Sequence, residues 1–202
     1  NMRSRIPVVP KSLMDFVVRA YAKHDKAHDQ NHAYHVFYNA IKIVQQENIQ
    51  MTEQEQKEFP FVMLCHDVLD HKMKDTLDPD EVYEFYESQL GSESASKIAY
   101  IHNNCSWSKR LESVPLTSGD WMRLVLQDAD WLEAIGAVGL QRCIDYTNAN
   151  APTNENTGAH IRAAVCKHIN EKLLLIADNL NFASSKKMAA DLNKPLLKYL
   201  KE

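Results

Sequence analysis

The chain has 202 residues, of which 45% are hydrophobic and 25% charged, a composition typical of one globular domain with a sizeable core. Six Phe, eight Tyr and three Trp, against only five Gly and seven Pro, exclude a disordered or low-complexity chain. The net charge of −4 arises from interspersed acids and bases, so neither nucleic acid nor an anionic membrane is expected as a partner.

A cytoplasmic location is expected. No apolar run approaches the roughly 20 residues that span a bilayer. The first five residues, Asn1-Met2-Arg3-Ser4-Arg5, lack the apolar core of a signal peptide. Asn1 ahead of Met2 is interpreted as a cloning scar.

The first part of the chain predicts a series of helices. Apolar residues recur at helical spacing over residues 13–21 and again over 33–44. Thr52 and Glu55 form a capping-box pattern ahead of a segment that ends in the apolar run 61–65. Because five consecutive apolar residues leave no polar face, this segment is expected to be buried and to bring the residues after it into the interior.

The remaining pattern is also helical. Asp78 and Pro79 begin a helix that ends near Gly91. Since no stretch shows sustained strand alternation, the fold class is predicted as all-α: a compact, single-domain helical bundle over residues 12–202, after an N-terminal extension at 1–11. Further helices are expected at about 93–105, 120–135, 158–180 and 184–200, with loops at 106–119 and 147–157.

The strongest chemical signal is the pair His66-Asp67, directly after the apolar run. An ionised carboxylate at that depth is costly unless it is paired, protonated or bound to a metal. Neighbouring residues on a helix point about 100° apart, so both side chains can still reach one ion beside the helix. The alternative is a capped helix end at which both side chains are solvated.

Candidate partners for this pair lie on other helices. His32 shares the inward stripe of the helix over 33–44. With His28 it forms an i,i+4 pair of the kind that binds zinc, although His28 precedes the expected helix start. Asp128 and Asp130 lie in an apolar helix, where spacing alone does not choose between them.

These residues carry a family resemblance. In chain order, His32, His66-Asp67 and Asp130 resemble the H…HD…D signature of the HD-domain metal-dependent phosphohydrolases. Longer segments also resemble the family's blocks over roughly residues 13–200: 28–32 (HDQNH) is similar to H-D-x-x-H, 66–72 (HDVLDHK) to H-D-I-x-D-x-K, 128–137 (DADWLEAIGA) to D-A-D-R-L-D-A-I-G-A, and 168–174 (HINEKLL) to H-F-x-E-K-L-L.

The resemblance implies an all-helical fold that holds one divalent metal ion through His32, His66, Asp67 and Asp130, and so selects Asp130 over Asp128. Mixed nitrogen and oxygen ligands suit Mn²⁺, Fe²⁺, Zn²⁺ or Mg²⁺, in falling order of preference. The implied activity is hydrolysis of a phosphoester or phosphoanhydride in a small soluble substrate such as a nucleotide, by water that the metal activates.

The resemblance also suggests roles around the metal. Asp70 matches the acid beside the attacking water and is the candidate general base, with a surface acid as the alternative. His102 faces inward and is a candidate to protonate the leaving group or bind phosphate, with a hydrogen-bonded core histidine as the alternative. Lys72, Lys109 and Arg142 are candidates for phosphate binding, with ordinary surface charges as the alternative.

Three positions depart from the family pattern. His35 and Trp131 stand where the family has arginine, and Cys105 stands where it commonly has histidine. Since polyphosphates are normally held by basic side chains, these changes speak against a nucleoside triphosphate as substrate.

Two other functions stay open. One is a metal- and ligand-binding module of this fold without hydrolytic activity. The other is oxidative chemistry at two irons, for which His71 and His102 are the local candidates as extra ligands. The sequence gives no support for an oligomer.

Overall fold

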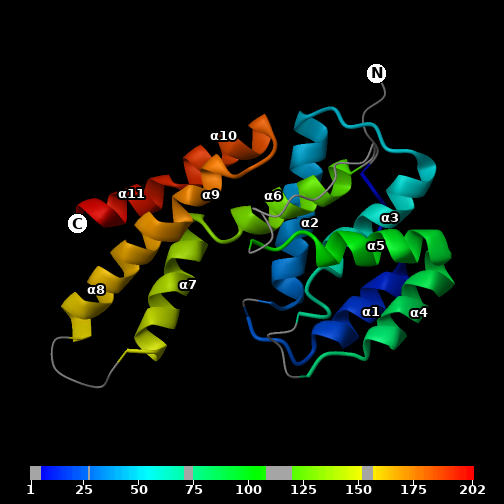
Figure 1. Ribbon diagram of the computed structural model, residues 1–202, viewed down its shortest axis with the longest axis horizontal. Helices are drawn as coiled ribbons and strands as arrows, with labels where there is room; N and C mark the ends of the chain where they lie inside the picture. Colours follow the sequence, from blue (N-terminus) through cyan, green and yellow to red (C-terminus); the bar gives the residue numbers. More distant parts are fainter. Residues whose placement is uncertain (1–5, 27, 71–74, 108–119, 152–156) are drawn as a thin grey trace. The chain divides into compact units, whose positions relative to one another are not determined.

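The computed structural model describes residues 6–26, 28–70, 75–107, 120–151 and 157–202. These residues form helices and no strand, which confirms the all-α fold class (Figure 1). The chain divides into two compact units, residues 1–129 and 130–202. The predicted division into an extension at 1–11 and a domain at 12–202 stays a prediction.

The first unit is arranged around α3. Its helix α3 contacts α2, α4 and α5, while α1 packs on α2 and α4 packs on α5. Phe59, Phe61, Met63 and Leu64 of α3 are fully buried, as the apolar run predicts. The helices are α1 (Lys11–Tyr21), α2 (Gln30–Gln46), α3 (Glu53–Leu64), α4 (Pro79–Leu90), α5 (Ser92–Asn103) and the beginning of α6 (Trp121–Leu132).

Capping residues set the ends of these helices. The Asp29 side chain accepts hydrogen bonds from the backbone N–H groups of Asn31 and His32, so α2 begins at Gln30 and His28 precedes it, as expected. The predicted capping box between Thr52 and Glu55 is present at the start of α3. The Asp29 cap sets the start of α2, which carries the candidate ligand His32. The Thr52 cap sets the start of α3, which precedes the candidate ligand His66.

The second unit contains a helix that the sequence pattern did not predict, α7 (Gly136–Ala149). A Cβ atom added at Gly139 would clash with the backbone oxygen of Ala134, so only glycine allows this close approach. Glycine is a poor helix former, and its presence masks the helical pattern.

The other predicted helices of this unit are interrupted. The segment 158–180 forms α8 (Thr157–His168), a π-helical turn (Ile169–Leu173) and α9 (Leu175–Asp178). The segment 184–200 divides into α10 (Ala183–Leu192) and α11 (Lys194–Lys201). The second break precedes Pro195, which has no N–H group to donate to the preceding turn. None of the described helices combines the length and hydropathy needed to cross a membrane.

The capping box makes the stability of α3 testable. We expect Thr52→Ala to lower the free energy of unfolding by about 1 kcal/mol, because the N–H of Glu55 loses its acceptor. Urea denaturation measures the change. Ser88→Ala is the control, because that hydroxyl donates to the Phe85 carbonyl inside α4 and caps no helix. Equal losses in the two variants would contradict the role of the cap.

Candidate metal centre

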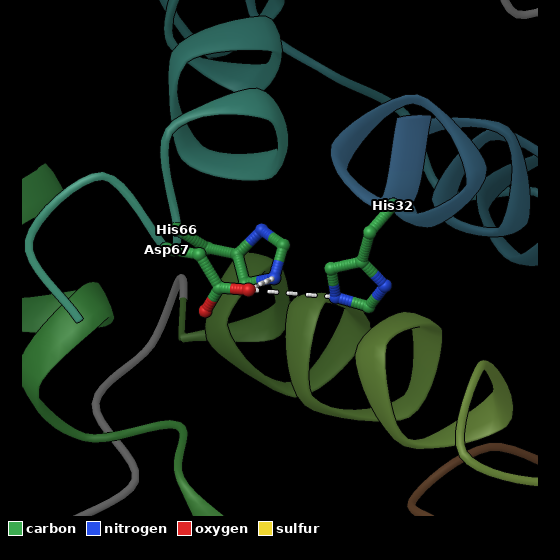
Figure 2. Close-up of side chains that lie close together, drawn as sticks. All are labelled: His32, His66 and Asp67. Atoms are coloured by element: carbon green, nitrogen blue, oxygen red, sulfur yellow. Dashed lines mark ion pairs between the residues drawn. The ribbon is translucent and has the colours of Figure 1, made fainter. Parts of the chain in front are cut away.

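Three side chains predicted as metal ligands meet in the first unit (Figure 2). The Oδ2 atom of Asp67 lies 3.5 Å from Nε2 of His32 and 3.3 Å from Nε2 of His66. The two imidazole rings face the same space, with their centroids 5.3 Å apart. All three ligand atoms lie within 4.8 Å of one another. The structure therefore brings together residues from α2 and from the turn after α3.

The spacing of these atoms fits a shared cation. Distances of 3.3 and 3.5 Å exceed those of ordinary hydrogen bonds. Two ligand atoms that each bind one ion at about 2.1 Å lie roughly 3.0 Å apart in octahedral geometry and roughly 3.4 Å apart in tetrahedral geometry. Imidazole nitrogens with a carboxylate oxygen suit Mn²⁺, Fe²⁺ or Zn²⁺. The donor set thus fits the divalent metal that the sequence implies.

Hydrogen bonding orients the His66 ring. Its Nδ1 donates to the Met63 carbonyl at 2.9 Å, because a carbonyl oxygen only accepts. This contact places a proton on Nδ1 and turns Nε2, the nitrogen left to bind a metal, toward Asp67. A backbone carbonyl behind the ring is a common partner of metal-binding histidines.

A buried tyrosine from α1 holds the turn that carries Asp67. The Oη of Tyr21 donates to the Leu64 carbonyl at 2.6 Å and accepts from the Asp67 N–H at 3.3 Å. One hydroxyl thus satisfies a carbonyl at the end of α3 and the amide of a candidate ligand. The apolar spacing of residues 13–21 predicts Tyr21 only as a core residue and gives no sign of this role.

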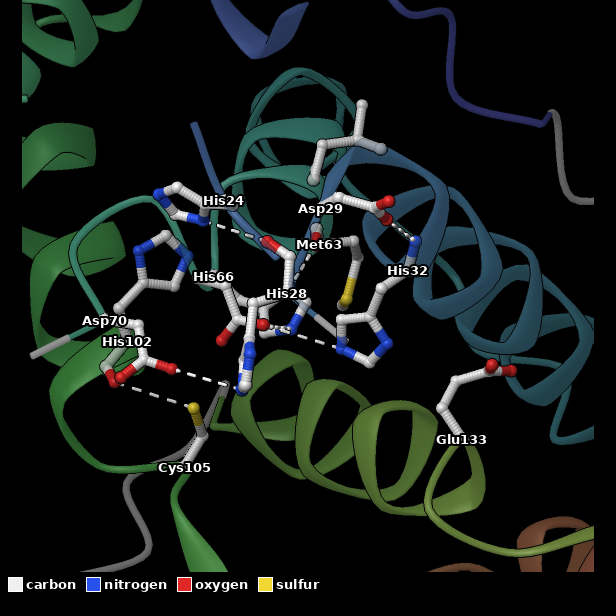
Figure 3. Close-up of polar contacts among 12 residues, drawn as sticks. His24, His28, Asp29, His32, Met63, His66, Asp70, His102, Cys105 and Glu133 are labelled. Atoms are coloured by element: carbon white, nitrogen blue, oxygen red, sulfur yellow. Dashed lines mark hydrogen bonds and ion pairs between the residues drawn. The ribbon is translucent and has the colours of Figure 1, made fainter. Parts of the chain in front are cut away.

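Asp70, the candidate general base, lies beside the ligands. Its N–H donates to the Asp67 carbonyl at 3.1 Å, so one turn of backbone fixes the two acids relative to each other. Its Oδ2 lies 3.6 Å from Nε2 of His28. Ligand atoms of His28, Asp67 and Asp70 form a second group within 4.8 Å of one another, and Figure 3 marks the ion pair between His28 and Asp70. His28 therefore faces Asp70, a pairing that the sequence pattern does not indicate.

His102 lies against α3. Its Nε2 donates to the Val62 carbonyl at 2.8 Å, and burial lowers the pKa of the imidazole to about 4. The ring is therefore neutral near pH 7, which favours the alternative of a hydrogen-bonded core histidine.

The fourth predicted ligand, Asp130, is half-buried on α6 and is the first residue of the second unit. Within the first unit, Asn39 of α2 donates to the carbonyl of the preceding residue, Ala129, at 3.2 Å. Asp128 is fully buried. Ligation by Asp130 stays a prediction.

The predicted phosphate-binding residues are described only in part. Arg142 lies on α7, where its Nη1 donates to the Glu133 carbonyl at 3.5 Å. Lys72 and Lys109 lie outside the described residues, as does His71. Phosphate binding by Lys72, Lys109 and Arg142 stays a prediction.

The positions that depart from the family pattern differ in exposure. His35 is exposed on α2, whereas Trp131 and Cys105 are buried. The Cys105 thiol donates to the His102 carbonyl at 3.6 Å. Cys105 is therefore a buried residue that packs against the end of α5.

The sequence matches known proteins of uncharacterized function. No family model matches the chain. It is 30% identical over 146 residues to the uncharacterized protein YpgQ of Bacillus subtilis, a match that covers 69% of this chain and 67% of YpgQ. It is also 30% identical over 155 residues to an uncharacterized protein of Acanthamoeba polyphaga mimivirus, covering 68% of this chain and 61% of the viral protein.

Solved structures share the fold. The crystal structure of YpgQ in complex with ADP has a TM-score of 0.70 and 26% identity, covering 93% of this chain and 88% of YpgQ. An HD-superfamily hydrolase from Bacillus thuringiensis has a TM-score of 0.67 and 24% identity, covering 93% of this chain and 90% of the hydrolase. The fold is therefore of the HD-domain type.

The Tyr21 contacts predict that this hydroxyl supports the candidate site. We expect Tyr21→Phe to weaken Mn²⁺ binding about 10- to 100-fold, as losses behind metal ligands commonly do. It should also lower the free energy of unfolding by about 1–3 kcal/mol, because two backbone groups lose their partner. Isothermal titration calorimetry and thermal unfolding measure the two effects.

Tyr83→Phe is the matched control. Its hydroxyl shares a hydrogen bond with the Ser96 hydroxyl at an exposed position between α4 and α5. This variant should bind Mn²⁺ as the wild type does. Unchanged Mn²⁺ affinity in Tyr21→Phe would show that the hydroxyl does not position Asp67.

Proposed function

The chain belongs to the same family as YpgQ of Bacillus subtilis, and we propose that it is a metal-dependent phosphohydrolase. It would hydrolyse a phosphoester or phosphoanhydride bond in a small soluble substrate, with a nucleotide as the favoured class. The observation that carries this proposal is the meeting of His32, His66 and Asp67 with spacing that suits a divalent cation. The HD-superfamily hydrolase from Bacillus thuringiensis, which has the same fold, also supports the proposed activity.

The proposed ligands of the cation are His32, His66, Asp67 and Asp130. Two neutral imidazoles and two carboxylates balance an ion of charge +2, and Mn²⁺ is the favoured metal. A divalent ion held by such ligands supplies Lewis acidity toward water and a phosphoryl oxygen. The chain's own contribution is to hold the ligands apart at the right spacing, through the Asp29 cap of α2 and the Tyr21 contacts.

Asp70 is the proposed general base. Its carboxylate lies within 4.8 Å of the Asp67 ligand oxygen, so a water molecule beside Asp67 would be within its reach. Asp70 would accept a proton as water forms a bond to phosphorus. The phosphorus–oxygen bond to the leaving group then breaks, and the leaving oxygen takes a proton from solvent. His102 is not needed for this transfer, because its Nε2 donates to Val62.

The substrate class rests on the chemistry of phosphate recognition. YpgQ has been crystallised with ADP, which supports a nucleotide for this chain as well. Lys72, Lys109 and Arg142 are the proposed partners of the phosphate oxygens, since cationic side chains form strong hydrogen bonds with phosphate.

His66→Ala tests the metal centre. We expect the variant to lose bound Mn²⁺ in elemental analysis after dialysis, because one of the two imidazole ligands is absent. Mn²⁺ should raise the melting temperature of the wild type, since binding to the folded state stabilises it, and should leave that of the variant unchanged. His160→Ala, at an exposed position on α8, is the control. Retention of Mn²⁺ by His66→Ala would contradict the assignment.

The activity is tested with purified protein loaded with Mn²⁺, on a panel of nucleotides and sugar phosphates. We expect release of phosphate or pyrophosphate from at least one compound, and loss of this release after treatment with a chelator. No release with Mn²⁺, Fe²⁺, Zn²⁺ or Mg²⁺ would contradict the proposed hydrolase. It would favour the non-catalytic binding module instead.

Asp70→Asn tests the general base. We expect kcat to fall by about 10²- to 10⁴-fold, because the amide no longer accepts a proton, while the substrate's KM changes little. Asp178→Asn, at an exposed position in the second unit, controls for the loss of one negative charge. Wild-type turnover in Asp70→Asn would remove Asp70 from the reaction.

A further inference from the structure

We propose that helix α11 of one chain docks, antiparallel, on helix α4 of a second copy. The contact joins a stripe of exposed lysines on α11 to a stripe of exposed acids on α4. It is independent of the proposed hydrolase, because neither helix carries a residue of the candidate metal centre. Every copy of the chain supplies both faces, so no other partner is needed.

The lysine stripe lies on the outer face of α11. Lys194, Lys198 and Lys201 stand at positions i, i+4 and i+7, which fall within about 60° of one another around a helix. All three side chains are exposed. Leu196, on the opposite side of the helix, is fully buried. Helix α11 is thus anchored in the second unit by its apolar side and presents three ammonium groups to solvent.

The acidic stripe on α4 has the same spacing. Asp80, Glu84 and Glu87 also stand at positions i, i+4 and i+7 and are exposed. Val82 and Tyr86, on the opposite side of α4, are buried. Each stripe extends about 10 Å along its helix. The two helices therefore present faces of equal length and opposite charge.

The charges of both stripes find few partners within the chain. Lys194 pairs with Asp191 at 2.9 Å. Within the described part of the chain, no ion pair is formed by the other five side chains, Asp80, Glu84, Glu87, Lys198 and Lys201. Like charges at i,i+4 destabilise a helix. A second copy offers each stripe the opposite charge at the matching spacing.

The helix dipoles select the antiparallel direction. A helix is stabilised by acids near its N-terminus and by bases near its C-terminus. Glu87 lies in the last turn of α4, and Lys194 is the first residue of α11, so both charges oppose the dipole of their own helix. In an antiparallel pair Glu87 meets Lys194, and Asp80 meets Lys201. The two unfavourable charges then neutralise each other.

An apolar residue stands beside each stripe. Leu197 is 45% exposed next to the lysines, and Tyr83 is half-buried next to the acids. Each follows the first charge of its stripe by three positions, so the two side chains lie on the same side of an antiparallel pair. Contact between Leu197 and the Tyr83 ring would remove apolar surface from water and add to the charge pairs.

The contact is expected to be weak. Exposed ion pairs contribute little individually, and a contact between two short helices falls in the class of small, transient interfaces. We expect a dissociation constant on the order of 10⁻⁴ M. It should rise steeply with salt, because the Debye length falls to about 3 Å at about 1 M.

Analytical ultracentrifugation of the whole chain tests the contact. At low salt, the mass of the wild type should rise above that of one chain between about 10 µM and about 1 mM. It should return to that of one chain in about 1 M NaCl. Lys198→Glu combined with Lys201→Glu makes both faces acidic, and Glu84→Lys combined with Glu87→Lys makes both basic. Each double variant should remain a single chain.

A mixture of the two double variants tests the pairing itself. Each α11 then meets an α4 of opposite charge, so the mixture should associate as the wild type does. Lys167→Glu combined with Lys172→Glu, at exposed positions outside α11, is the control for net charge and should still associate. Far-ultraviolet circular dichroism confirms folding. Lys198→Gln combined with Lys201→Gln replaces the first double variant if that one does not fold.

The outcomes decide between a second copy and other occupants. A single-chain mass for the wild type at all concentrations overturns the proposal, as does association of both double variants alone or failure of their mixture to associate. A single-chain wild type that binds phosphatidylglycerol vesicles through Lys198 and Lys201 would assign the α11 face to membranes and reject the second copy. None of these results depends on Mn²⁺ or substrate, so the proposed hydrolase is tested separately.

Discussion

The site depends on the cost of placing a histidine and an aspartate at the end of a buried helix. The five apolar residues before His66 bury the end of α3 in the interior. The turn that follows α3 therefore also begins in the interior. An ionised Asp67 beside two imidazoles is stabilised by a cation far more effectively than by packing. The neighbouring contacts are consistent with this demand, because Met63 and Tyr21 hold the ligands in orientations that suit a metal.

The position of Asp70 follows from the same constraint. Asp70 lies one turn beyond Asp67, and this turn brings its carboxylate to 3.6 Å from Nε2 of His28. The two histidine rings are oriented by separate contacts, His66 by the Met63 carbonyl and His28 by the Asp25 carboxylate.

The sequence was sufficient to predict much of the fold and to select three candidate ligands whose side chains meet. Local signals decide these features: the capping box at Thr52, the glycine after α4, and the helical spacing of His32 with the core. The sequence pattern does not predict helix α7, because it contains Gly139. This glycine is required by a close contact with the Ala134 backbone, which the local sequence does not reveal.

The parts of the site that were missed depend on contacts between distant segments. The Tyr21 hydroxyl reaches Asp67 from 46 positions away, and His28 meets Asp70 across a similar separation. The sequence instead suggested a pairing of His28 with His32, because both lie close together along the chain. The helix cap at Asp29 separates their roles, since it places His28 before the first turn of α2.

The most direct test of the metal centre is a crystal structure of the protein grown with Mn²⁺, with anomalous scattering used to locate the ion. The account predicts an anomalous peak about 2.0–2.2 Å from Nε2 of His32, Nε2 of His66 and an oxygen of Asp67, with a carboxylate oxygen of Asp130 completing the set. A salt-bridging cationic side chain in that space, with no anomalous peak, would contradict it.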